Sequence, residues 1–146
     1  MSTNLHDTEK FLLDHIPLAR AMGVKLEDRS KGGLILSAPL ETNSNHLGSA
    51  FGGSISALAT LAGYALLWLE LGDPNAHIVI RSSAVSYESP LHGDLRAICL
   101  QPDEQALATF RAHFKKAGKA RIFLSVHLTD GETTHARFEG EYVAIR

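Results

Sequence analysis

The sequence predicts an α+β domain in which an antiparallel sheet wraps around one long helix. Residues 53–71 carry no charged side chain before Glu70, and they are rich in Ala and Leu, which favour helix. Because apolar side chains lie all round this helix, it has no polar face to show to water and must be buried. Residues 120–129 and 132–145 alternate apolar and polar side chains, as strands with one buried face do. Antiparallel strands following one buried helix are typical of the α+β class.

The residues before the sheet predict a short helical arm. Asp7 or Thr8 can cap a first helix, Pro17 interrupts it, and a second helical turn ends at Met22. We expect this arm, about residues 7–22, to pack against the domain and not to form a domain of its own.

The remaining elements follow from turn residues and periodicity. They are strands at 24–28, 34–40, 77–89 and 94–101 and a helix at 104–117. Lys31-Gly32-Gly33 predicts the turn between the first two strands. Asp130-Gly131 predicts a two-residue hairpin turn of type I′ between the last two.

Composition limits the classes of function. The 146 residues suit a single domain, 1–146, and the net charge of −2 argues against a nucleic-acid partner. The single Cys99 excludes an internal disulfide, and its place in an apolar strand predicts an inert, buried thiol. The eight histidines show no metal-binding spacing. The acidic N-terminus lacks an apolar signal core, so we expect a cytoplasmic location.

A membrane span is the competing interpretation of the long apolar segment. Its length is close to the ~20 residues that a bilayer requires. However, the segment contains Ser and Thr hydroxyls and several glycines, and it lacks cationic or aromatic belts at both ends. We therefore expect no membrane span.

The segment before the long helix carries a resemblance to a known family. Residues 45–53, NHLGSAFGG, are similar to the N-x-x-G-x-x-H-G-G segment of small acyl-CoA thioesterases. Residues 87–94 resemble the strand–Pro–turn–strand step of the same enzymes. Together with LAGYALLWLE and GKARI, they resemble the putative thioesterase family typified by the YiiD C-terminal domain, from about Ile16 to the end. The resemblance implies the hotdog fold.

The resemblance also implies a site at the start of the helix. In the family, backbone N–H groups there polarise a thioester carbonyl, and Gly52 and Gly53 match these donors. Asn45 matches a residue that orients substrate or water. Two positions depart from the pattern: Phe51 replaces the usual His, as a pocket wall, and Thr60 replaces the usual carboxylate.

Thr60 leaves two interpretations open. Its hydroxyl cannot act as a base unaided, although it can hold a water. Equally, it can bond back to a carbonyl one turn earlier. Ser54 and Ser56 are further candidates for substrate binding. The small side chains of Gly53, Ser56, Thr60 and Gly63 share one helix face, which predicts either a cavity or a close approach of another chain segment.

Two functions follow from these residues. The first is hydrolysis of an acyl-CoA or acyl-carrier-protein thioester, with no cofactor beyond the coenzyme A of the substrate. The alternative is a non-catalytic module that binds an acyl thioester or a lipid. The family resemblance implies a homodimer, or a dimer of dimers, with each site built across an interface. Lys115, Lys116, Lys119 and Arg121 form a basic cluster that is a candidate for the phosphates of coenzyme A.

Overall fold

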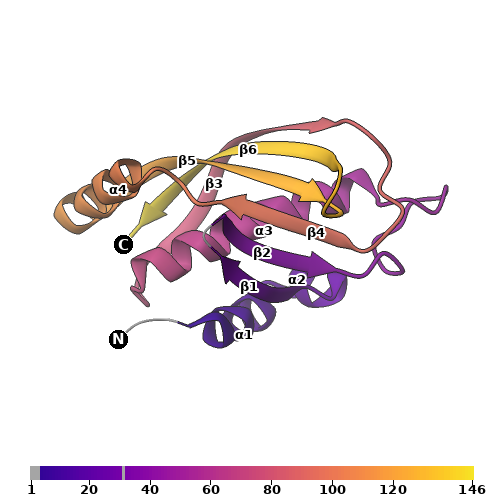
Figure 1. The fold of residues 1–146 in the computed structure, drawn as a ribbon. Coiled ribbons are helices and arrows are strands. Elements are labelled where there is room, and N and C mark those ends of the chain that lie inside the picture. Colours follow the sequence, from indigo (N-terminus) through magenta and orange to yellow (C-terminus); the bar gives the residue numbers. More distant parts are fainter. Residues whose placement is uncertain (1–3, 31) are drawn as a thin grey trace.

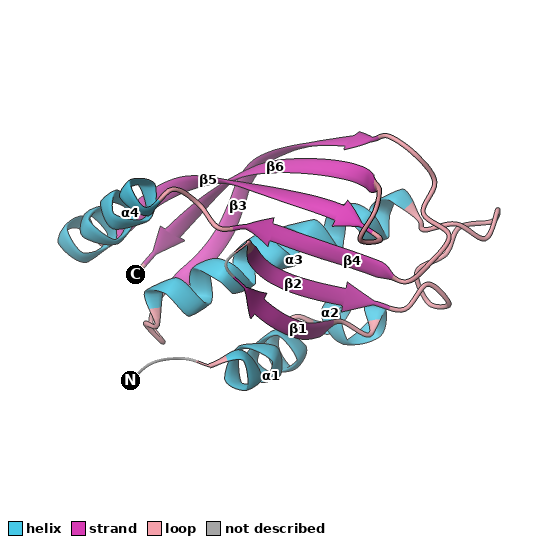
Figure 2. Ribbon diagram, viewed as in Figure 1, coloured by secondary structure: helices cyan, strands magenta, loops and turns pink. Residues whose placement is uncertain are grey.

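The computed structural model describes residues 4–30 and 32–146. Lys31, in the predicted first turn, lies outside the described residues. The elements are α1 (Leu5–His15), α2 (Pro17–Met22), β1 (Lys25–Ser30), β2 (Gly33–Ala38), α3 (Gly52–Leu71), β3 (His77–Tyr87), β4 (Leu95–Leu100), α4 (Glu104–Ala117), β5 (Lys119–Thr129) and β6 (Thr134–Ile145). The predicted α+β class is confirmed, because one antiparallel sheet in the order β1-β2-β4-β5-β6-β3 curves around α3 (Figures 1 and 2).

The central helix α3 is the core of the molecule, as predicted. Ten of its twenty residues are buried, including Leu58, Leu66 and Leu67. By length and composition alone α3 is apolar enough to cross a membrane, but here the sheet covers it. The inner faces of the strands supply most of the remaining core residues, and α1, α2 and α4 add others such as Leu12, Met22 and Phe110. On β5 the predicted alternation is exact, with every second residue from Ala120 to Leu128 buried.

The N-terminal arm begins earlier than predicted. Asn4, and not Asp7 or Thr8, caps α1: its side chain accepts a hydrogen bond from the Asp7 N–H at 2.8 Å. The helix therefore gains a turn, and Thr8 becomes a buried helix residue. The ring of Phe11 stacks on Trp68 of α3 with centroids 4.1 Å apart, so the arm is packed on the domain.

The hairpin between β5 and β6 also differs from the prediction. Thr129 pairs with Thr134, so the loop has four residues and not two. Among the described residues no non-glycine has positive φ, whereas a type I′ turn requires positive φ at both Asp130 and Gly131. The Asp130 carboxylate instead accepts the N–H groups of Glu132 and Thr133 at 2.9 and 2.8 Å. This side-chain cap favours the longer loop.

Strand β3 forms one edge of the sheet. It pairs with β6 on one side, and within the described chain its other side has no strand partner. Of its eleven residues only Ile78 is buried. A long exposed edge of this kind is a template for pairing with another strand.

Candidate functional site

The N-terminus of α3 opens onto a pocket. Phe51 is the N-cap residue, and no side chain of the described chain caps this helix end. The N–H groups of the first turn, which include those of Gly52 and Gly53, have no partner within the helix. The pocket has a volume of about 440 Å³, and its lining includes Asn45, Ser49, Gly52, Ile55, Tyr87, Glu88 and Ser89. Positive helix-end dipoles therefore lie beside a cavity, which is an arrangement suited to a carbonyl oxygen that gains negative charge.

Asn45 borders this pocket, but its side chain also organises its own loop. Its Oδ1 accepts the N–H groups of Leu47 at 2.8 Å and Ser49 at 3.2 Å. Its Nδ2 donates to the Ser49 hydroxyl at 2.9 Å. One amide hydrogen is left over, so Asn45 can position the loop and still donate one bond towards the pocket.

Thr60 lies in a different, mainly apolar pocket. This second pocket has a volume of about 470 Å³ and is lined by Ile16, Leu18, Ala57, Thr60, Leu61, Tyr64, Ile78, Val79, Ile80 and Tyr142. The Thr60 hydroxyl donates to the Ser56 carbonyl at 2.9 Å, which is the back-bonded arrangement. Its oxygen retains lone pairs that can accept a bond from a water. Within one chain, Thr60 and Asn45 do not line the same pocket.

The other predicted site residues lie along the first turns of α3. Phe51 is 54% exposed, and its ring lies over Gly53: a Cβ built on Gly53 would be 2.5 Å from the ring. Ser54 and Ser56 are half-buried.

The predicted strip of small residues has two different environments. At its start it reaches the surface around Gly53. Further along, Gly63 is buried against Tyr142, whose hydroxyl would be 2.2 Å from an added Cβ. The Tyr142 hydroxyl donates to the carbonyl of Thr60 at 2.9 Å, and burial raises the pKa of this phenol. Close packing therefore explains the inner half of the strip.

Sequence reasoning missed the charged residue that borders the α3 pocket. Glu88 follows β3 and forms an ion pair with Arg137 of β6, with Oε2 and Nε 3.0 Å apart. Glu88 and Asn45 are far apart in the sequence, and no local pattern indicates that they meet. Their segments are joined by tertiary contacts, such as the hydrogen bond from the Ala50 N–H to the Leu91 carbonyl at 2.8 Å. Cys99, in contrast, has no part in either pocket; burial raises its pKa to about 12, as expected of an inert thiol.

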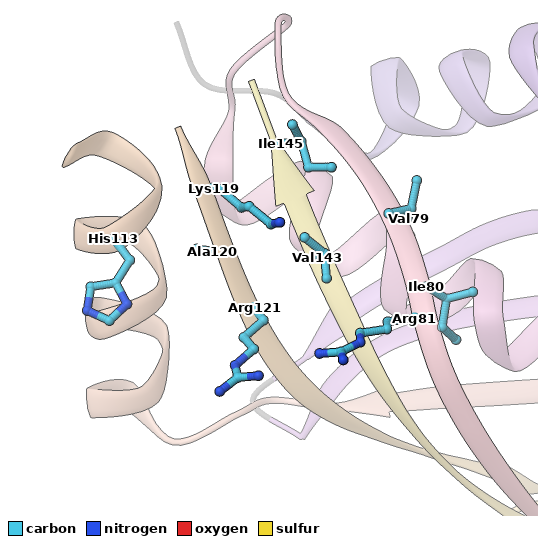
Figure 3. Close-up of a pocket in the computed structure, with 9 residues that line it drawn as sticks. All are labelled: Val79, Ile80, Arg81, His113, Lys119, Ala120, Arg121, Val143 and Ile145. Carbon is cyan, nitrogen blue, oxygen red and sulfur yellow. The ribbon is translucent and has the colours of Figure 1, made fainter. Parts of the chain in front are cut away.

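The predicted basic cluster is divided by the fold. Lys119 and Arg121 of β5 line a hollow of about 720 Å³ on the outer face of the sheet, together with Arg81 of β3 and His113 of α4 (Figure 3). Lys115 and Lys116 do not line it, and they occupy the last turn of α4, where cations complement the helix dipole. Arg81 and Arg121 both reach the carboxylate of Glu141, at 3.8 and 3.6 Å. The hollow retains a net positive charge.

Comparison with models of known protein families shows to which family this chain belongs. A family model described as "Putative thioesterase (yiiD_Cterm)" matches residues 5–146. The chain belongs to this family. The match covers both pockets and every strand of the sheet, so the resemblance seen in residues 45–53 extends to the whole fold.

Solved structures of similar chains have the same fold. A protein of unknown function from Chlorobaculum tepidum is 33% identical, with a TM-score of 0.88 over 97% of this chain and 93% of that one. A protein from Shewanella oneidensis, described as a putative thioesterase, is 27% identical, with a TM-score of 0.83 over 97% of both chains. A Pseudomonas aeruginosa protein described as a probable thioesterase is 23% identical, with a TM-score of 0.82 over 99% and 97%. The fold is therefore the hotdog fold of this superfamily.

Proposed function

We propose that the protein hydrolyses the thioester of an acyl-CoA or acyl-carrier protein at the N-terminus of α3. The observation that carries the proposal is the uncapped first turn at Gly52 and Gly53, which borders a pocket. The thioester carbonyl points its oxygen at these N–H groups, which stabilise the charge that develops there. The absence of side chains on both glycines lets the substrate approach the backbone closely. Coenzyme A enters as part of the substrate, and no other cofactor is needed.

A homodimer completes the site in this proposal. The α3 pocket contains Tyr87, at the end of β3, and the apolar pocket contains Val79 and Ile80, near its start. If two copies pair antiparallel along β3, the Tyr87 end of one lies beside the Val79 end of the other. Each α3 pocket then adjoins the apolar pocket of the second copy. Such a two-fold interface is self-complementary.

This pairing assigns a different part of the substrate to each of the two pockets. The apolar pocket of one copy takes the acyl chain, and the α3 pocket of the other holds the thioester carbonyl. Asn45 donates its remaining amide hydrogen to the attacking water, and Thr60 of the second copy accepts a bond from the same water. Neither group removes a proton, since neither is a base at neutral pH.

Replacing Asn45 or Thr60 by Ala is expected to lower the rate of hydrolysis about 100-fold in each case, the usual cost of losing one positioning or stabilising group. Steady-state assays with a thiol reagent measure this, and acyl-CoA binding should survive. A wild-type rate in both variants, with the fold intact, would place the chemistry elsewhere.

The alternative is a module that binds an acyl thioester or lipid without turnover. The specific observation in its favour is that no acidic residue lines the apolar pocket around Thr60. Incubation of the pure protein with acyl-CoAs of increasing chain length, with a thiol reagent present, separates the two functions. Thiol release that depends on the protein supports hydrolysis. Saturable binding by calorimetry without thiol release supports the module.

The hollow on the outer face of the sheet is proposed to bind the phosphates of coenzyme A. Changing Lys115, Lys116, Lys119 and Arg121 together to Ala should weaken binding of coenzyme A at low salt, because charge-assisted bonds to phosphate are lost. Changing only the pair outside the hollow, Lys115 and Lys116, is the matched control and should have little effect. Titration calorimetry measures both. Equal affinity for all forms would show that the cluster is only a solvated face.

The dimer itself is testable. We expect two copies per particle, or a dimer of dimers, in sedimentation at micromolar concentration. Ala84→Arg, which lies on the exposed edge strand β3, should shift the particle towards monomer because it brings two guanidinium groups close to the two-fold axis. A stable wild-type monomer at micromolar concentration would contradict the prediction.

A further inference from the structure

Three side chains that are distant in sequence form a hydrogen-bonded chain beside the α3 pocket. The hydroxyl Oγ of Ser89 is 2.8 Å from Nδ1 of His135. The other ring nitrogen of His135, Nε2, is 2.9 Å from Oδ2 of Asp130. Ser89 itself lines the α3 pocket, as Gly52 does. A hydroxyl, an imidazole and a carboxylate in series are the arrangement that activates a serine for nucleophilic attack.

The fold holds these groups from two directions. The segment after β3 is docked on β6, because the N–H groups of Glu88 and Ser89 both donate to the carbonyl of His135, at 2.8 and 3.2 Å. The β5–β6 loop, which begins at Asp130, lies at the same end of the molecule as the N-terminus of α3 (Figure 1). The His135 side chain is only 11% exposed, so its ring has little freedom to turn away.

The two hydrogen bonds select one tautomer of a neutral His135 imidazole. With a neutral imidazole, both bonds are satisfied when Nε2 donates to Asp130 and Nδ1 accepts from the Ser89 hydroxyl. The hydrogen bond from His135, with two backbone N–H groups of its own loop, holds the pKa of Asp130 well below its usual range. Asp130 is therefore a carboxylate at neutral pH, and in the neutral His135 imidazole Nδ1 is the nitrogen that faces the Ser89 hydroxyl.

We propose that Ser89 is the nucleophile of this protein, that His135 is its general base and that Asp130 is the positioning residue for the imidazole. The inference rests on the proposed function and supplies what that function lacks, which is a group able to remove a proton. It keeps the site and the substrate, and it moves the water held by Asn45 and Thr60 to the second step, where it attacks the ester on Ser89. It assigns this role to residues outside the family segment at 45–53 and outside α3.

The reaction balances in two steps. In the first, Ser89 Oγ forms a bond to the thioester carbonyl carbon and its proton passes to Nδ1 of His135. The carbon–sulfur bond then breaks, the thiolate takes that proton, and the free thiol leaves an ester on Ser89. In the second, a water attacks the ester and gives a proton to His135, the carbon–Oγ bond breaks, and Oγ regains the proton. The products are a carboxylic acid and a thiol, and the N–H groups of Gly52 and Gly53 stabilise both tetrahedral intermediates.

The same network has a purely structural interpretation, in which it only ties the β5–β6 loop to the segment after β3. A structural tie gives Ser89 no unusual reactivity. A nucleophile reacts with a fluorophosphonate, whose phosphorus bonds to Oγ as fluoride leaves. The rate of this reaction depends on the general base, so it separates the two interpretations without any assumption about the acyl substrate.

The experiment treats the full-length protein with a fluorophosphonate and follows intact mass and the labelled peptide. We expect one label per chain, on Ser89. Ser89→Ala should abolish labelling, and His135→Ala should slow it about 100-fold or more, the lower end of general-base contributions. Asp130→Asn keeps an oxygen for the turn N–H groups but removes the charge, and it should slow labelling at least tenfold. Ser86→Ala, at an exposed serine outside the pocket, is the matched control and should label normally.

A conservative variant shows whether a loss of labelling reflects lost reactivity or a lost fold. Ser89→Cys should be alkylated by iodoacetamide at a rate that falls when His135 is also replaced, with thermal unfolding used to show that each variant is folded. Acyl-CoA hydrolysis at the wild-type rate in Ser89→Ala, with no label on Ser89 in the wild type, would overturn this inference and leave the proposed function standing. His135-dependent labelling of Ser89 without any acyl-CoA hydrolysis would support the nucleophile and overturn the thioester substrate.

Discussion

Replacing Gly63 by Val is expected to lower the free energy of unfolding by about 3 kcal/mol, near the upper end of the usual cost of overpacking a core. A Cβ at this position would be 2.2 Å from the hydroxyl of Tyr142 and 2.3 Å from the adjoining ring carbon. Tyr142 is fully buried, and its hydroxyl is bonded to the carbonyl of Thr60, so the ring cannot turn aside. Either the ring or the whole of α3 must shift.

Chemical denaturation measures this effect, and Gly53→Ala on the same helix face is the control. The three atoms nearest to a Cβ at Gly53 all belong to the Phe51 ring, which is more than half exposed and can rotate. The free energy of unfolding of Gly53→Ala should stay near the wild-type value or rise by up to about 1 kcal/mol, because Ala favours helix over Gly. A loss below about 1 kcal/mol in Gly63→Val would mean that the contact between α3 and β6 is looser than the structure indicates.

The fold was largely predictable because its signals are local. The apolar segment of α3 and the alternation in β5 and β6 each require only neighbouring residues, and Gly118 marks the end of α4 at the expected place. The errors were also local. The cap of α1 lies three residues before the predicted one, since Asn4 and Asp7 are both acceptable cap residues and the sequence does not rank them. At the β5–β6 turn the side chain of Asp130 overrode the two-residue preference.

The candidate site was only half predictable for a physical reason. Residues near Gly52 carry a family pattern, whereas Ser89 and His135 are 46 positions apart and meet only through sheet pairing. From the sequence, Ser89 was predicted as the end of a strand and Asp130 as a turn residue. Neither prediction says which side chain the residue is hydrogen-bonded to. The same applies to Glu70, whose buried carboxylate bonds Arg111 of α4, 41 positions away. Periodicity predicts which face of an element is buried, but it does not predict which polar groups meet across elements.

Replacing Gly53 by Val is expected to lower thioester hydrolysis about 1,000-fold, the upper end of the loss found when one stabilising donor is removed. The branched side chain would stand where the substrate carbonyl has to approach the first-turn N–H groups. It would also displace the Phe51 ring, whose edge is 2.5 Å from an added Cβ, and so narrow the entrance further. Because Gly53 is exposed, we expect the fold to be retained.

Steady-state acyl-CoA hydrolysis and circular dichroism of the purified variant test this prediction together. Gly93→Val is the matched control: it adds the same side chain at a glycine with no atom within 4 Å of its Cβ position and with no place in either pocket, so its rate should equal that of the wild type. The reaction of Ser89 with a fluorophosphonate adds a second readout. The phosphoryl oxygen of this reagent accepts hydrogen bonds from the same N–H groups, so labelling of Ser89 should also be slow in Gly53→Val. Hydrolysis within about tenfold of the wild-type rate in Gly53→Val would mean that the carbonyl is polarised by groups other than the N-terminus of α3.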